Sequence, residues 1–133
     1  MHVDASVKLP GDLRAPAEAR RFVARHLSTW LEREDVESAV LVTSELVTTV
    51  SGRADECLLD LHLAGPILRV EVCDHRPGPR ETTYAELKSG RSLRLLEVLC
   101  RRWGVEDTPG DGTTLWCELR VRPQPADSAR GSS

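Results

Sequence analysis

The apolar pattern is clearest between Asp35 and Arg53, where it predicts an amphipathic helix. The apolar positions there are Val36, Ala39, Val40, Leu46, Val47 and Val50, with Thr43 among them. They recur at steps of three and four, so one stripe of this helix is expected to pack against a core. Asp35 stands where the side chain of an N-cap residue would bind the first free N–H groups.

Two further segments show the same helical period. The first begins at Pro16, a residue suited to a first helical turn, and is expected to end near Leu31. The second begins near Ser92, continues to Trp103 and is expected to end at Gly104, because glycine commonly follows the last turn.

Alternating positions predict the strands. The segments 57–64 and 67–73 alternate between apolar and polar residues around Gly65 and Pro66, which predicts an antiparallel hairpin. Shorter strands are expected over 5–9 and 105–108, and a final strand over 113–121 follows an Asp-Gly turn. This order predicts an α+β two-layer sandwich, with a mostly antiparallel or mixed sheet and helices on one face.

Composition narrows the class of protein. The 133 residues carry a net charge of -3, which argues against a general nucleic-acid-binding surface. No apolar run approaches the roughly 20 residues of a membrane span, and the N-terminus lacks a signal-peptide pattern. The four cysteines are far apart, so we expect free thiols in the cytoplasm and no metal site. Residues 1–122 are expected to form one domain and 123–133 a disordered tail.

Two carboxylates are candidates for function. Glu45 lies on the central helix with Thr49 one turn further along, and a surface glutamate is the simpler interpretation. Asp74 follows Val72 by two residues, so it points toward the buried side of the sheet. Asp74 either binds hydrogen-bond donors there or caps the turn that follows, and the alternation leaves both interpretations open. Residues 75–91 lack a period and predict a long loop, which in a compact domain is usually either a functional lid or disordered.

Four motifs in order resemble the GHKL, or Bergerat-type, ATP-binding fold and, within it, the short anti-sigma-factor serine kinases of actinomycetes. They are L-V-T-S-E-L-V-T-T-V, L-R-V-E-V-C-D, G-R-S-L-R-L-L-E-V-L-C-R-R-W-G-V and D-G-T-T-L-W-C-E-L. The resemblance extends from about Leu9 to Leu119.

The resemblance implies roles for individual residues. Glu45 would be the general base for phosphoryl transfer, and Asp74 would accept a hydrogen bond from the adenine amino group. The nucleotide-binding residues implied beside Asp74 are Thr49, Gly78, Gly90, Ser92, Leu93 and Thr114. ATP and Mg²⁺ would be the cofactors.

The sequence also departs from the family pattern. Thr49 replaces an asparagine that binds Mg²⁺, and a single hydroxyl is a poorer ligand than an amide oxygen. Ser92 replaces a glycine beside the phosphates, Arg76 replaces the first glycine of a D-x-G-x-G pattern, and Thr113 replaces a frequent lysine. These changes should weaken binding of Mg·ATP and phosphoryl transfer.

Two hypotheses follow. In the first, the chain is a regulatory protein of the anti-sigma-factor type that acts by binding another protein, with weak or lost ATP binding and kinase activity. In the alternative, it is an active ATP- and Mg²⁺-dependent serine kinase that phosphorylates a STAS-type antagonist. The implied partners are a sigma factor, a STAS-type anti-anti-sigma protein or another regulator, and relatives of this type imply a homodimer. A nucleotide hydrolase or histidine-kinase fragment is disfavoured, because no helix with a phosphoacceptor histidine precedes the domain.

Overall fold

The sheet has five strands and is antiparallel throughout. The computed structural model describes residues 2–50, 56–74, 92–108 and 112–124. In chain order the elements are β1 (His2–Pro10), α1 (Ala15–Leu27), α2 (Arg33–Val50), β2 (Glu56–Ala64), β3 (Ile67–Cys73), α4 (Ser92–Leu99), β4 (Arg102–Thr108) and β5 (Gly112–Arg120). The strand order is β1-β2-β3-β5-β4.

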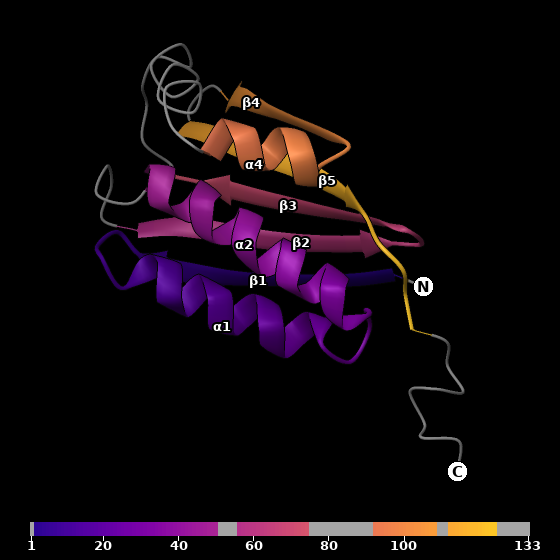
Figure 1. The fold of residues 1–133 in the computed structure, drawn as a ribbon. Coiled ribbons are helices and arrows are strands. Elements are labelled where there is room, and N and C mark those ends of the chain that lie inside the picture. Colours follow the sequence, from indigo (N-terminus) through magenta and orange to yellow (C-terminus); the bar gives the residue numbers. More distant parts are fainter. Residues whose placement is uncertain (1, 51–55, 75–91, 109–111, 125–133) are drawn as a thin grey trace.

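The three described helices lie on one face of this sheet (Figure 1). Antiparallel ladders join β1 to β2, β2 to β3 and β4 to β5, and β3 also pairs with β5. Gly65, between β2 and β3, has a φ of 57°, which suits the tight turn of the hairpin. The predicted α+β sandwich is therefore confirmed, with a purely antiparallel sheet.

The core lies between the sheet and the helices. Leu59, Leu61 and Leu63 of β2 are at most 1% exposed, and the alternating residues of β3 and β5 are buried beside them. From the helices the core receives Ala15, Ala19, Val23, Leu27, Val36, Ala39, Val42, Leu46, Val47 and Val50. Burying each leucine contributes about 1.5–3 kcal/mol, so this layer supplies most of the driving force for folding.

The third predicted helix is shorter than expected. Helix α4 ends at Leu99, and Trp103 and Gly104 belong to β4. Trp103 pairs with Cys117 of β5, and the Arg101 N–H donates to the Glu118 carbonyl at 2.8 Å. The prediction that Gly104 ends the helix was wrong, because ladder hydrogen bonds to β5 outweigh helix propensity there.

The ends of the other helices also differ from the prediction. Helix α1 ends at Leu27 rather than near Leu31, and α2 begins at Arg33. Asp35 therefore lies inside α2 and is not its N-cap. Its carboxylate instead accepts a hydrogen bond from the Arg122 N–H at 2.7 Å.

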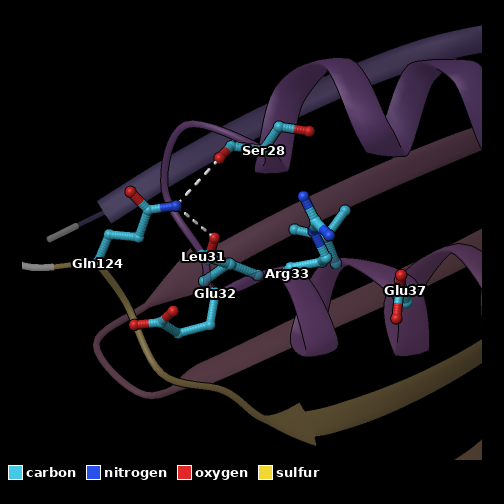
Figure 2. Close-up of a pocket in the computed structure, with 7 residues that line it drawn as sticks. Ser28, Leu31, Glu32, Arg33, Glu37 and Gln124 are labelled. Carbon is cyan, nitrogen blue, oxygen red and sulfur yellow. Dashed lines mark hydrogen bonds between the residues drawn. The ribbon is translucent and has the colours of Figure 1, made fainter.

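Residues 122–124, which we call the C-terminal strap, hold the turn between α1 and α2. Pro123 forms a β-bridge with Leu31, and the Gln124 N–H donates to the Trp30 carbonyl at 2.8 Å. The Gln124 side-chain amide donates to the carbonyls of Ser28 and Leu31 (Figure 2). Pro123 and Gln124 are thus packed against the domain, and the rest of the predicted tail, 125–133, lies outside the described residues.

Charged residues form a continuous network on the sheet face opposite the helices. Glu118 accepts hydrogen bonds from Arg102 at 3.0 Å and from Arg69 at 3.2 Å. The Arg69 guanidinium also lies 4.2 Å from the centroid of the Trp116 ring, a cation–π distance. Because the ion pairs cross three strands, they fix the register of β3, β5 and β4 from the uncovered side.

The same network reaches the edge strand β1. Asp4 accepts hydrogen bonds from His2 at 2.9 Å and from His62 at 2.8 Å, and these bonds lower the pKa of its carboxyl group. Beside it, the Ser6 hydroxyl binds Asp60 of β2. Polar contacts therefore hold β1 to β2 on the side opposite the described helices.

No disulfide joins the four cysteines, all of which lie in the described ranges. Cys57 and Cys117 are buried, whereas Cys73 and Cys100 are half-buried. No helix in the described ranges is both long and apolar enough to cross a membrane.

Candidate functional site

The described candidate residues collect at one end of the sandwich. The C-terminal ends of α2 and β3 lie at the same end of the sheet as the N-terminal end of β5 (Figure 1). Helix α2 packs against α4, β3 and β5, which connects these elements. Glu45 and Thr49 come from α2, Asp74 directly follows β3, and Thr114 belongs to β5.

Asp74 is a buried carboxylate, as the strand alternation predicts. It is 3% exposed, and its Oδ1 accepts a hydrogen bond from the Thr113 N–H at 3.2 Å. Its own N–H donates to the Thr113 carbonyl at 3.2 Å. The described contacts thus include one donor across the sheet, and the turn of the second interpretation lies outside the described residues.

The charge of Asp74 also affects a neighbouring thiol. The pKa of Cys57 is raised to about 11, first by burial and then by the negative charge of Asp74. Cys57 is therefore protonated at neutral pH and a poor nucleophile. This excludes Cys57 as a reactive group of the site.

Glu45 and Thr49 lie on neighbouring turns of α2, and both are half-buried. The Thr49 hydroxyl donates to the Glu45 carbonyl at 3.0 Å, a bond that threonine often makes to the residue four positions earlier in a helix. At about 100° per residue, the Glu45 side chain leaves the helix on the side away from Thr43 and Val47. It lines a hollow between α1 and α2.

The structure does not bring Thr114 to Asp74. Thr114 lies opposite Cys73 and alternates with the buried row of β5, so its side chain is on the uncovered face of the sheet. Thr113, which is 2% exposed, is the residue that contacts Asp74. From the sequence we named Thr113 only as the replacement of a frequent lysine and did not predict its contact with Asp74, although its place in the alternation with Leu115 and Cys117 was the signal for it.

The remaining predicted residues belong to α4 and to the segment before it. Ser92 is the first residue of α4, and Leu93 is half-buried in its first turn. Gly78 and Gly90 lie outside the described residues. The roles of these four residues in nucleotide binding therefore stay predictions.

The Asp74 carboxylate has the chemistry to bind the adenine of a nucleotide. A buried carboxylate such as Asp74 can accept from an exocyclic amino group, which matches the chemistry of adenine. Mg²⁺ is usually bound through one or two carboxylates together with phosphate oxygens. Within the described ranges, no three His, Cys, Asp or Glu residues come together to hold a metal ion, and Thr49 supplies only a hydroxyl.

Comparison with solved structures finds this fold in a crystal structure of the RsbU and RsbW domains of Rv1364c from Mycobacterium tuberculosis. The TM-score is 0.69 at 20% sequence identity, over 93% of this chain and 34% of that chain. This chain thus covers about a third of that protein's solved length, and at such identity the likeness shows the fold alone. No protein-family profile matches the sequence, and no curated protein matches it.

Proposed function

We propose that this chain is a regulatory protein of the anti-sigma-factor type that acts by binding another protein and has lost kinase chemistry. The order of four sequence motifs supports this proposal, and so does the fold shared with the structure of the RsbU and RsbW domains. In this proposal the chain keeps the fold as a scaffold for a partner protein and has lost the residues that would bind Mg²⁺.

Thr49 carries this proposal. Its hydroxyl is engaged with the Glu45 carbonyl at 3.0 Å at the position where the resembling kinases place a metal-binding asparagine. Phosphoryl transfer relies on the metal to neutralise charge on the β- and γ-phosphates. Without that ligand, and with Thr113 in place of a lysine, the charge that develops on the phosphates is left uncompensated.

An active serine kinase is the second candidate, and the retention of Glu45 and Asp74 favours it. Glu45 has the chemistry of a general base, and Asp74 is buried at the end of β3 as an adenine acceptor requires. In this case the substrate would be a serine on a STAS-type antagonist.

The proposed partner is a sigma factor, a STAS-type anti-anti-sigma protein or another regulator. Self-association through β1 or α1 is a further part of the proposal. Light scattering at micromolar concentration tests it, because a dimer mass is expected and a monomer mass at every concentration contradicts self-association.

Isothermal titration with ATP, with and without Mg²⁺, distinguishes the two candidates. The wild type and Asp74→Asn are compared, and the binding protein is expected to give no heat that depends on Mg²⁺. Mg²⁺-dependent heat that disappears in Asp74→Asn overturns the proposal in favour of the kinase. Transfer of labelled γ-phosphate to a purified STAS protein is the matching assay, and it is expected to stay at background.

A further inference from the structure

A long groove runs along the boundary between α1 and α2. It consists of two hollows of about 600 Å³ and about 580 Å³, which share Val36 and Glu37. The first hollow lies beside the α1–α2 turn, where Gln124 of the C-terminal strap closes it (Figure 2). The second continues along α2 as far as Glu45.

Three rows of residues spaced by four make up most of its walls. Helix α1 and the residue after it contribute Arg20, Ala24 and Ser28. From α2 and the residue before it come a row nearer to α1, which is Glu32, Val36, Val40 and Ser44, and an outer row, which is Arg33, Glu37, Leu41 and Glu45. Such rows form the ridges and grooves into which another helix packs.

The middle of the groove is apolar. Ala24 is small enough to leave depth on the α1 side, and Val36 and Val40 form the wall opposite. Leu41 is 45% exposed beside these residues, so about half of its apolar side chain is left uncovered by the described part of the chain. A partner that covers Leu41 would therefore gain hydrophobic stabilisation.

The outer row carries negative charge on both sides of Leu41. Glu37 lies one turn before it and Glu45 one turn after it. Among the described residues the Glu37 carboxylate forms no ion pair, whereas the Arg20 guanidinium on the opposite wall donates to the Ser44 hydroxyl at 3.0 Å. The outer row thus places the Glu37 and Glu45 carboxylates on either side of one exposed apolar side chain, with Arg33 one turn before Glu37.

We propose that this groove binds an amphipathic helix of a protein partner. The partner helix places a large apolar side chain against Leu41 and basic residues about two turns apart against Glu37 and Glu45. The groove extends from Glu32 to Glu45, which at 1.5 Å per residue is about 20 Å, the length of a helix of about 13 residues. Length, apolar centre and charge all fit this class of occupant.

An extended peptide fits this groove less well. Strand addition requires unpaired backbone N–H and C=O groups, and the walls are helices whose backbone groups are bonded internally. The groove also gives Glu45 a role that needs no nucleotide, because its carboxylate would bind a basic side chain of the partner.

This inference rests on the proposed function in taking the occupant to be another protein. The two can nevertheless fail separately. Mg²⁺-dependent ATP binding in calorimetry would overturn the loss of kinase chemistry and leave the groove intact, whereas the peptide experiment below does not involve nucleotide.

The probe is a pair of synthetic helical peptides of about 14 residues with the same leucine ridge. One carries lysines about two turns apart beside the ridge, and the other carries glutamates at the same positions. Fluorescence anisotropy with the full chain is expected to show binding of the lysine peptide at least about tenfold tighter than that of the glutamate peptide.

Leu41→Glu tests whether the peptide occupies the groove. This variant is expected to weaken binding of the lysine peptide by at least about tenfold, although it makes the protein more acidic. Leu13→Glu is the matched control, because Leu13 is 96% exposed outside the groove and the added charge is the same. Glu37→Lys is expected to reverse the preference between the two peptides.

The outcomes are separable. Equal binding of both peptides, no binding of either, or equal effects of Leu41→Glu and Leu13→Glu would each overturn the proposal. If Leu41→Glu converts a dimer into a monomer in light scattering and Leu13→Glu does not, a second copy of this chain occupies the groove, and the assignment to a different protein is wrong.

Discussion

Asp74 and Thr113 are joined by two hydrogen bonds, one between backbone groups and one to a side chain, both 3.2 Å long, which tie the end of β3 to the start of β5. One of these bonds ends on the buried Asp74 carboxylate. The pair therefore holds together the two strand ends where the candidate site lies, whether or not a nucleotide binds there.

Replacing Asp74 should separate its structural role from its charge. Asp74→Ala leaves the buried Thr113 N–H without its acceptor, so we expect a loss of about 1–3 kcal/mol in the free energy of unfolding. Asp74→Asn keeps an amide oxygen at the same place and should lose less. Urea denaturation of the three proteins measures the difference, and equal losses in both variants would show that charge, not the hydrogen bond, is responsible.

Replacing Thr43 should raise the free energy of unfolding, the opposite of replacing Asp74. It is fully buried on α2, and its hydroxyl has no hydrogen-bond partner in the described structure. Thr43→Val keeps the shape and removes the unsatisfied group, so we expect a gain of about 1 kcal/mol in the free energy of unfolding. Thr48→Val is the exposed control on the same helix and should change it little. A destabilised Thr43→Val would mean that the hydroxyl is satisfied in solution.

Thr49→Asn restores the amide that the resemblance implies at the metal position. If Asp74 and the rest of the pocket are intact, we expect the variant to bind Mg·ATP more tightly than the wild type in calorimetry. Thr48→Asn, one position away on the exposed side of α2, is the control. No gain from Thr49→Asn would show that the nucleotide pocket is damaged beyond this residue.

Gly104 is a glycine because Trp116 occupies the space beside it. A Cβ at position 104 would lie 2.9 Å from Cζ2 and from Nε1 of the Trp116 ring. Gly104→Ala should therefore lower the free energy of unfolding by about 1–3 kcal/mol and alter tryptophan fluorescence. In the double variant with Trp116→Leu the alanine should cost less, and additive losses would contradict the clash.

Glu118 should make stability depend on pH. Hydrogen bonds from Arg102 and Arg69 lower the pKa of its carboxyl group below the usual value of about 4.3, although burial opposes them. The stability that it contributes is then complete above that value and is lost as the pH falls through the lowered pKa. Glu118→Gln should be less stable than the wild type at pH 7, and this difference should shrink toward pH 3. Glu106→Gln, at an exposed ion pair of 3.8 Å, is the control and should change stability little.

The local period of the sequence predicted most elements of the fold. The hairpin of β2 and β3 and the buried direction of Asp74 followed from alternation alone, because each strand meets the core on one side only. The boundary between α4 and β4 could not be predicted in this way, because Trp103 continues the helical spacing and also fits the strand. Its pairing with Cys117 decides the conformation, and that partner is distant in the sequence.

The sequence names candidate site residues one by one but does not give their arrangement in space. Glu45, Thr49 and Asp74 could be singled out from motifs, whereas the contact between Asp74 and Thr113 depends on the register of β3 against β5. The groove depends on how closely α1 and α2 approach each other, and the apolar spacing within one helix does not determine this distance. For the same reason Leu41 was not recognised as exposed.

The C-terminal strap has a consequence for the order in which the chain can fold during synthesis. The carbonyls of Ser28 and Leu31 receive their donors from Gln124, which is 96 and 93 residues later in the chain. Residue 124 must therefore have been translated before the strap can hold the turn between α1 and α2. The groove that begins at this turn becomes complete only at that stage, so a partner helix would meet the complete groove only after almost the whole domain has been made.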